Sequence, residues 1–264
     1  MKGIYMLTEY ILVVLFCLIT GYIGGYAGIG GGVVLIFLFT TFLNYPQHMA
    51  QGTIMAIMLG PLTITGVMVM KKRIKPLLVY ALIGIITYPV FSWLGAVLAY
   101  SFPSRQLRLI FAVFLVVLGL YNFFYFLLKK EAAEKKPLLT LNYFYMVLAS
   151  ILMGFVGGLL GIGAGVLLVP LLTWLFGMEK DDARTLSFMV LLPPVNLAAV
   201  LNYYTRGDVF WPVVIPGFLC LMFSNYWGAR MGKKHENRIF QLGLSGILCV
   251  LGCINIVLSL RQIS

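Results

Sequence analysis

The stretch GYIGGYAGIGGG, residues 21–32, carries seven glycines in twelve positions, and GFVGGLLGIGAG at residues 154–165 repeats the pattern. Glycine is about 1 kcal/mol less favourable than alanine inside a helix. Each stretch therefore predicts a break between two apolar helices, where glycine also lets a ligand approach the backbone closely. Glycines at a spacing of four are also typical of close helix packing, so packing is the alternative interpretation.

The composition is that of an integral membrane protein. Of the 264 residues, 61% are hydrophobic and 10% are charged, and the mean hydropathy is +1.00. A soluble domain carries roughly a quarter charged residues. Apolar runs of about 20 residues recur along this chain, as in membrane-spanning helices. We therefore expect an all-α, multi-pass protein of the cell (plasma or inner) membrane.

The sequence also contains an internal duplication. A shift of 133 residues aligns its two halves without a gap, and 11 of the 23 residues at 21–43 are identical to those at 154–176. The duplication predicts a first transmembrane repeat at 1–128, a cytoplasmic linker at 129–137 and a second transmembrane repeat at 138–264.

Each repeat is predicted to hold a helix, a glycine break, a short apolar arm and three further helices. The predicted segments of the first repeat are 7–24, 31–44, 50–70, 77–100 and 107–128. Those of the second repeat are 141–157, 164–177, 185–204, 210–230 and 238–259.

The positive charges predict how the repeats are oriented. If each glycine stretch turns the chain back, the repeats are inverted, and 14 Lys and Arg residues lie on the linker side against 5 on the other. If each stretch only kinks a spanning helix, the repeats are parallel and the division is 11 against 8. Because positive residues concentrate on the cytoplasmic side, we favour inverted repeats with a cytoplasmic linker.

The short arms after the breaks, residues 33–43 and 166–176, are too short to span a membrane alone. The start of each arm would present free N–H groups and about half a positive charge to the interior. Two such arms converging near the midplane would suit an anion. The candidate substrate-binding residues are Gly28, Gly30, Gly31, Gly32, Thr40, Thr53, Gly161, Gly163, Ala164, Gly165, Thr173, Ser187 and Asn196.

The sequence GIGAGVLLVPLL, residues 161–172, resembles the signature of the TauE/SafE family of sulfite and organosulfonate exporter-like permeases. The first copy, GIGGGVVLIFLF, has Phe37 where the family usually has proline. AQGTI at 50–54 and ARTLS at 183–187 resemble the family's A-x-G-T-S pattern, and the second carries Arg184 and Leu186 where small or hydroxyl residues are typical. The resemblance implies about eight spans and secondary transport of a small, often sulfur-containing anion, such as sulfite or an organosulfonate.

These features together predict a permease that works without a cofactor or a metal, by movement of one repeat against the other. Its partners are then a small anionic substrate and the lipid bilayer, with a homodimer as a compatible assembly. Nucleic acid is not expected, because the net charge of +11 comes from short hydrophilic gaps and not from one basic face. The alternative is a non-transporting membrane subunit whose glycines serve only packing or assembly.

No residue pattern indicates an enzyme. All eight acids lie in loops or near segment ends, so no carboxylate relay for proton coupling is predicted. His48 is placed in a loop. Pro61, Pro193 and Pro194 are predicted to kink or pack helices. Arg184 either lies at the membrane interface or reaches inward.

Overall fold

The computed structural model describes residues 2–27, 31–70, 73–128, 142–163, 165–175, 177–234 and 238–261. Every regular element within these ranges is helical, which confirms the all-α prediction. Six of these helices are long and apolar enough to cross a membrane, namely α1 (Lys2–Ala27), α5 (Ile74–Ala99), α6 (Ser104–Leu128), α7 (Tyr143–Leu160), α11 (Val214–Lys234) and α12 (Arg238–Arg261).

Shorter helices lie between the long ones. They are α2 (Gly32–Phe42), α3 (Gln47–Ile57), α4 (Ile64–Val69), α8 (Gly165–Leu175), α9 (Lys180–Val190), α10 (Leu197–Thr205) and the 3-10 helix η3 (Trp211–Val213). The 133-residue offset between the sequence halves carries both bounds of α2 onto those of α8, and both bounds of α3 onto those of α9. The two halves therefore follow the same order of elements.

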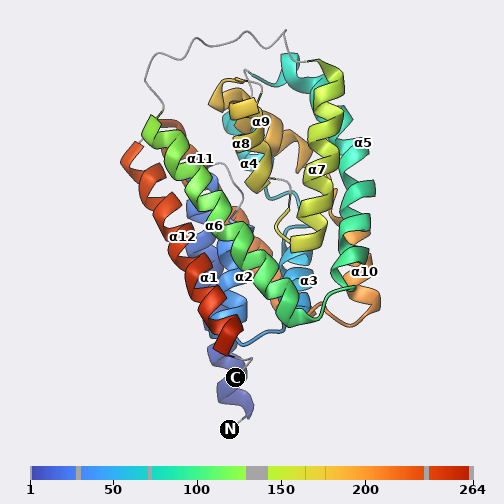
Figure 1. Cartoon of the computed structure of the whole chain (residues 1–264), viewed down its shortest axis with the longest axis vertical. Helices are drawn as coiled ribbons and strands as arrows, with labels where there is room; N and C mark the ends of the chain where they lie inside the picture. The colour runs from blue at the N-terminus through green and yellow to red at the C-terminus, as the bar shows by residue number, and fades with distance from the viewer. Residues whose placement is uncertain are drawn as a thin grey trace.

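The long helices pack in pairs that join the two halves of the chain (Figure 1): α1 with α11, α5 with α7, and α6 with α12. Under the same offset α1 corresponds to α7 and α5 to α11, so the first two pairs are equivalent. Both termini lie at one end of the bundle, whereas α6 ends and α7 begins at the opposite end (Figure 1). Helices α1 and α7 thus run in opposite directions, which is the arrangement expected of inverted repeats.

Glycines form much of the contact surface in two of these pairs. A Cβ at Gly228 of α11 would overlap the backbone carbonyl of Tyr22 in α1, and a Cβ at Gly95 of α5 would overlap that of Phe155 in α7. The same tight approach to the partner helix occurs at Gly21, Gly25, Gly154 and Gly158. Close packing therefore accounts for these glycines. Close packing of helix pairs does not account for the glycines at the helix breaks.

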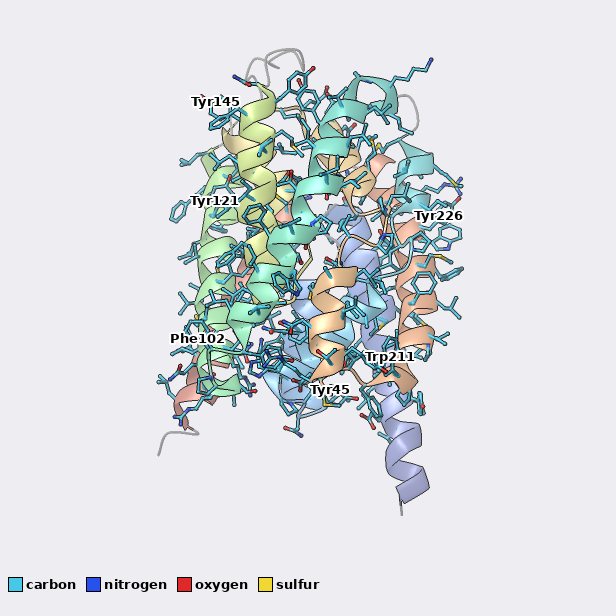
Figure 2. The ribbon with its side chains drawn as sticks, turned by 90° about the vertical axis from the view of Figure 1, so that its right-hand side faces the viewer. Tyr45, Phe102, Tyr121, Tyr145, Trp211 and Tyr226 are labelled. Atoms are coloured by element: carbon cyan, nitrogen blue, oxygen red, sulfur yellow. The ribbon has the colours of Figure 1, made fainter. Side chains whose placement is uncertain are left out.

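Aromatic side chains mark the ends of the bundle. Figure 2 shows Tyr45, Phe102 and Trp211 near the end from which α1 projects, and Tyr145 near the other end. Trp211 is 47% exposed and Tyr145 is 48% exposed. Half-exposed aromatic rings at both ends are typical of residues at the two membrane–water interfaces.

An ion-pair network joins the two repeats at the end of the bundle where α5 begins. Arg73, directly before α5, lies 3.0 Å from Glu179, 3.6 Å from Asp181 and 2.7 Å from Asp182, measured from guanidinium nitrogen to carboxylate oxygen. The hydrogen bonds to Glu179 and Asp182 raise the pKa of Arg73. The network therefore holds the start of α5 against the start of α9 through a permanent positive charge.

Candidate substrate site at the helix breaks

The first glycine stretch breaks the helix and turns the chain back. Gly31 has a φ of 71°, a left-handed conformation that other residues rarely adopt. It lies against the backbone carbonyl of Thr20, about two turns before the end of α1. Helix α2 therefore begins at Gly32 inside the bundle and not at its end. Gly28 and Gly30, also predicted for the site, lie outside the described residues.

The second glycine stretch breaks in the same way. Gly161 and Gly163 have φ values of 69° and 70°. The N–H of Gly161 bonds to the Gly157 carbonyl and so closes the end of α7. Helix α8 begins at Gly165, and the predicted site residue Ala164 lies outside the described residues. Both glycine stretches thus separate a long helix from a short arm of 11 residues.

Two further breaks interrupt helices that the sequence predicted to be continuous, so that prediction was wrong. The predicted helix at 50–70 is divided between α3 and α4, and the one at 185–204 between α9 and α10. Pro61 lies in the first gap, and Pro193 and Pro194 lie in the second. Proline lacks an N–H and its ring clashes with the preceding turn, so the helices end at these prolines and do not merely kink.

The helix breaks of the two repeats meet in the interior of the bundle. A Cβ built on Gly32 would lie 2.9 Å from Sδ of Met58 and 3.1 Å from the carbonyl oxygen of Ile162. A Cβ built on Gly163 would lie 3.2 Å from Cε of Met58 and 3.9 Å from Nδ2 of Asn196. Met58 belongs to the α3–α4 break and Asn196 to the α9–α10 break. The α1–α2, α3–α4, α7–α8 and α9–α10 breaks therefore all contribute to one site in the interior of the bundle.

Asn196, a predicted site residue, has its side-chain amide at the site where the breaks meet. Its side chain is 1% exposed, and its Oδ1 accepts a hydrogen bond of 3.0 Å from the Tyr88 hydroxyl of α5. The Nδ2 atom is the part of the amide nearest to Gly163. The bond to Tyr88 thus orients the amide so that its donor group faces the glycine break.

Gln51 of α3 also lies at the second break, although it was outside the predicted set. Its Cγ would be 2.7 Å from a Cβ at Gly161, and its side chain is fully buried. The Tyr203 hydroxyl lies 2.9 Å from Gln51 Oε1 and 3.2 Å from the Gly158 carbonyl oxygen. A phenol has one proton to donate. In the orientation shown, the Nε2 atom of Gln51 has no partner among the described residues. If the amide were turned over, Oε1 would be the atom without a partner.

Arg184 reaches inward, so its placement at the membrane interface was the wrong alternative. The side chain is 2% exposed, and Nη2 donates to the carbonyls of Gly25 and Tyr26 at 3.1 Å and 2.8 Å. These carbonyls lie in the last turn of α1, where no helical N–H follows to satisfy them. The guanidinium also complements the negative end of the helix dipole. Arg184 of the second repeat therefore closes α1 beside the first break.

Thr40 and Thr173 do not lie at the breaks, contrary to the expectation that they would lie close by. Each stands eight residues into its arm, about 12 Å along the helix axis. Each hydroxyl donates to its own helix, at 2.9 Å to Ile36 for Thr40 and at 2.9 Å to Val169 for Thr173. This local bond is common for threonine in transmembrane helices.

Thr53 and Ser187, the other predicted hydroxyl residues, are both fully buried. Thr53 accepts a hydrogen bond of 2.9 Å from the N–H of Phe210, which holds the loop after α10 against α3. The Ser187 hydroxyl has no hydrogen-bond partner in the part of the chain that is described. The next carbonyl along, that of Phe188, accepts a 2.8 Å bond from Thr63 in the α3–α4 break. Of the two, Ser187 is the one whose hydroxyl makes no hydrogen bond to the described residues.

The interior around the breaks favours a negative charge. Helices α2, α8 and α10 begin at the breaks, and each helix N-terminus carries about half a positive charge. Arg184 is buried, whereas no Asp or Glu of the described residues is. An anion at the breaks would therefore meet N–H donors without a competing buried carboxylate.

The sequence from residue 9 to residue 254 matches the family described as "Sulfite exporter TauE/SafE". The chain belongs to the TauE/SafE family. The match spans both repeats and so includes every helix break of the candidate site.

Relatives with the name "probable membrane transporter protein" share the length of this TauE/SafE chain. One from Bacillus subtilis is 26% identical, with 93% of this chain and 96% of the relative covered. One from Methanocaldococcus jannaschii is 25% identical, with coverage of 91% and 93%. One from Haemophilus influenzae is 24% identical, with coverage of 90% and 88%. Together with the apolar helices, these matches identify a multi-pass membrane transporter.

His48 packs inside this TauE/SafE fold. It does not lie in a loop, so that prediction was wrong. It belongs to α3 and is 9% exposed. Its Nδ1 lies 2.7 Å from the Ser104 hydroxyl, its Nε2 lies 3.1 Å from the Ala99 carbonyl, and its ring stacks on Tyr100. Both ring nitrogens are thus used to fix α3 against the turn between α5 and α6.

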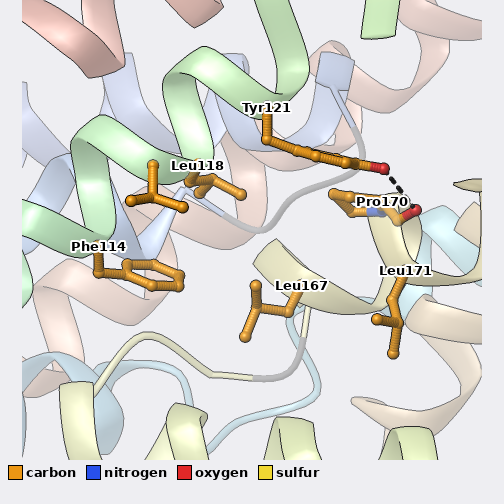
Figure 3. A pocket seen from close by; sticks show the side chains of 7 residues that line it. Phe114, Leu118, Tyr121, Leu167, Pro170 and Leu171 are labelled. Carbon is orange, nitrogen blue, oxygen red and sulfur yellow. Dashed lines mark hydrogen bonds between the residues drawn. The ribbon is translucent and has the colours of Figure 1, made fainter.

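An apolar cavity of about 210 Å³ lies between α6 and α8 (Figure 3). The residues that line it are Phe114, Val117, Leu118, Tyr121, Leu167, Pro170 and Leu171. The Tyr121 hydroxyl crosses it to donate a 3.3 Å bond to the Pro170 carbonyl. The lining offers no charge to an anion, so this cavity is not a candidate for the substrate site.

Proposed function

We propose that this transporter moves a small oxyanion, such as sulfite or an organosulfonate, by alternating access, with the anion held at the helix breaks. The observation that carries the proposal is the meeting of breaks from both repeats, in which Gly32 lies against Ile162 and Gly163 lies against Met58. A site made by both repeats changes its access from one side of the membrane to the other when one repeat moves against its partner.

The chemistry of the breaks supports an oxyanion. The donors available there are backbone N–H groups at the starts of the helices, the Asn196 amide and the unpartnered Nε2 of Gln51. Each oxygen of an oxyanion accepts such hydrogen bonds. The donors are neutral, so the anion is bound without a fixed ion pair and can be released on the other side. Sulfur oxyanions are the first choice because the family description names sulfite export.

The test is transport by purified protein in proteoliposomes. Uptake and counterflow would be measured for sulfite, methanesulfonate, sulfate and acetate. We expect saturable flux of at least one sulfur oxyanion, and a loss of about tenfold or more in Gly163→Ala. The loss follows because alanine at a φ of 70° is strained and its methyl group would lie 3.2 Å from Met58.

Gly207→Ala is the matched control. Gly207 has a φ of 79°, so alanine there meets the same backbone strain, but no atom lies within 4 Å of the new methyl group. We expect its flux to equal that of the wild type. Equal flux in both variants would contradict the proposed site. No flux of any anion through folded wild-type protein would instead support a subunit whose glycines serve only packing.

A further inference from the structure

A polar pocket of about 300 Å³ has Tyr45 among its lining residues. Figure 2 shows Tyr45 at the end of the bundle from which α1 projects, so the pocket lies at that end. Its lining includes the polar and charged residues Thr40, Asn44, Gln47, Ser104, Arg105 and Arg108. Thr40 places the pocket about 12 Å along α2 from the helix breaks. The pocket is therefore separate from the proposed substrate site but lies at the other end of the same arm.

Gln47 gives the clearest sign that the pocket is built for a ligand. Its side chain is 2% exposed, and neither Nε2 nor Oε1 has a hydrogen-bond partner in the described chain. A buried amide that makes no hydrogen bond costs on the order of 1–3 kcal/mol for each polar group. A ligand in the pocket that accepts from Nε2 would remove part of this cost.

Arg105 contributes a second unused donor on the same wall. Its Nε donates a 3.3 Å bond to the Ser259 carbonyl at the end of α12, which fixes the guanidinium in place. Its Nη2 is buried and has no hydrogen-bond partner within the described ranges. The planar guanidinium thus keeps one edge free, and that is the edge with which arginine binds oxyanions.

Arg108, one turn further along α6, adds a second positive charge. Its Nε donates a 2.9 Å bond to Asn255, and its Nη2 lies 3.4 Å from the Thr41 hydroxyl. Both partners are uncharged. No residue that lines the pocket is acidic, and the nearby Glu9 carboxylate already accepts a hydrogen bond from Tyr45. The pocket therefore has two positive charges that no lining carboxylate neutralises.

We propose that this pocket is a second anion-binding site, which holds a small oxyanion at the membrane surface opposite the linker. The free donors of Gln47 and Arg105 bind the anion, and the charge of Arg108 attracts it. The end of the bundle that holds the pocket carries few of the Lys and Arg residues, which makes it the extracytoplasmic end. The pocket would then load or release the transported anion on that side.

Equilibrium binding tests this site separately from transport. Methanesulfonate and sulfate would be titrated calorimetrically into the full chain in phosphatidylcholine nanodiscs at low chloride. We expect saturable binding that Arg105→Gln weakens at least about tenfold, because the free guanidinium edge is lost. We expect Gln47→Leu to weaken it by a similar factor while the protein unfolds at an equal or higher temperature, because an unpartnered amide is removed.

Two further variants separate this pocket from the helix breaks. Arg206→Gln removes an exposed arginine that lies over the Tyr100 ring at the same end of the bundle and does not line the pocket, so binding should be unchanged. Gly163→Ala alters the breaks and should leave the Arg105-dependent binding intact. Binding that survives both Arg105→Gln and Gln47→Leu, or that disappears only in Gly163→Ala, would overturn the second site whatever the outcome of the transport assay.

A lipid phosphate offers the same chemistry as a free oxyanion, and native mass spectrometry distinguishes the two sources. The protein would be released from nanodiscs that contain phosphatidylglycerol, and its bound lipids would be counted. We expect wild type and Arg105→Gln to retain the same number of lipids. A phosphatidylglycerol molecule that is retained by the wild type and lost in Arg105→Gln, without any binding of free methanesulfonate or sulfate, would show that the pocket serves lipid and would overturn the proposal.

Discussion

The ends of α1 and α7 occupy equivalent places in the two repeats, yet different chemistry closes them. At the end of α1, the buried Arg184 donates charge-assisted hydrogen bonds to two carbonyls of the last turn. At the end of α7, the neutral Tyr203 hydroxyl lies 3.2 Å from the Gly158 carbonyl. Gln51 stands at the position that the 133-residue offset relates to Arg184. The duplication has therefore kept the backbone and changed the group that closes each helix.

The comparison indicates that the two breaks have different roles, one in stability and the other in binding. Hydrogen bonds from a charged donor are roughly twice as strong as neutral ones, so the end of α1 is closed more strongly than the end of α7. The unpartnered atom of Gln51 lies at the more weakly closed end. We therefore expect Arg184 to act in holding the fold, and the region around Gln51 and Asn196 to act in binding.

The largest effect is expected from the removal of Arg184. Arg184→Leu leaves the carbonyls of Gly25 and Tyr26 without their donor, which should lower the free energy of unfolding by about 3 kcal/mol. Denaturant unfolding in detergent micelles measures the change. Arg206→Leu is the control, because Arg206 is exposed and the loss of its contact with the Tyr100 ring should cost less than about 1 kcal/mol. Equal effects of the two variants would break the comparison.

A second prediction concerns a pair of equivalent glycines that pack in the same way in the two repeats. Gly95 and Gly228 are related by the offset, and a Cβ at either would overlap a backbone carbonyl of the partner helix. Gly95→Ala and Gly228→Ala should each lower the free energy of unfolding by about 2 kcal/mol through overpacking. The same unfolding experiment compares them. Gly246→Ala, where nothing lies within 4 Å, should not lower the free energy of unfolding, because alanine is more favourable than glycine inside a helix.

Part of the fold could be predicted from the sequence, and part could not. The glycine stretches and the duplication were enough to predict an all-helical membrane protein with an early break in each half, because glycine content acts locally. The α3–α4 break has a local cause in Pro61. The surroundings of Arg184, however, depend on a contact between segments more than a hundred residues apart, and no local pattern reports such a contact.

The polar residues of the site were harder to assign from the sequence than the helix breaks. Thr40 and Thr173 were predicted for the site, yet both hydroxyls bond to their own helices. Gln51 was not chosen, although it is a polar residue in an apolar segment and its counterpart is Arg184. A comparison of the two copies for positions where polarity differs would have identified it.

A smaller effect is expected at Tyr203, which closes the end of α7. Tyr203→Phe removes a hydroxyl that lies within hydrogen-bond distance of both Gly158 and Gln51. The free energy of unfolding should fall by about 1 kcal/mol, the usual value of a neutral hydrogen bond. The loss should be clearly smaller than that in Arg184→Leu. A loss as large as that of the arginine variant would mean that charge makes no difference to how the two helices are closed.

The smallest effect on stability is expected at Gln51, the neutral counterpart of Arg184. Gln51→Met keeps the length of the side chain and removes an amide that is only half satisfied, so the free energy of unfolding should change by less than about 1 kcal/mol in either direction. Transport measured in the same preparation should nevertheless fall, because the variant removes a donor from the proposed site. A stable variant with wild-type flux would place Gln51 outside that site. A variant as unstable as Arg184→Leu would show that the two positions still share one structural role, because a half-satisfied amide has no comparable bonds to lose.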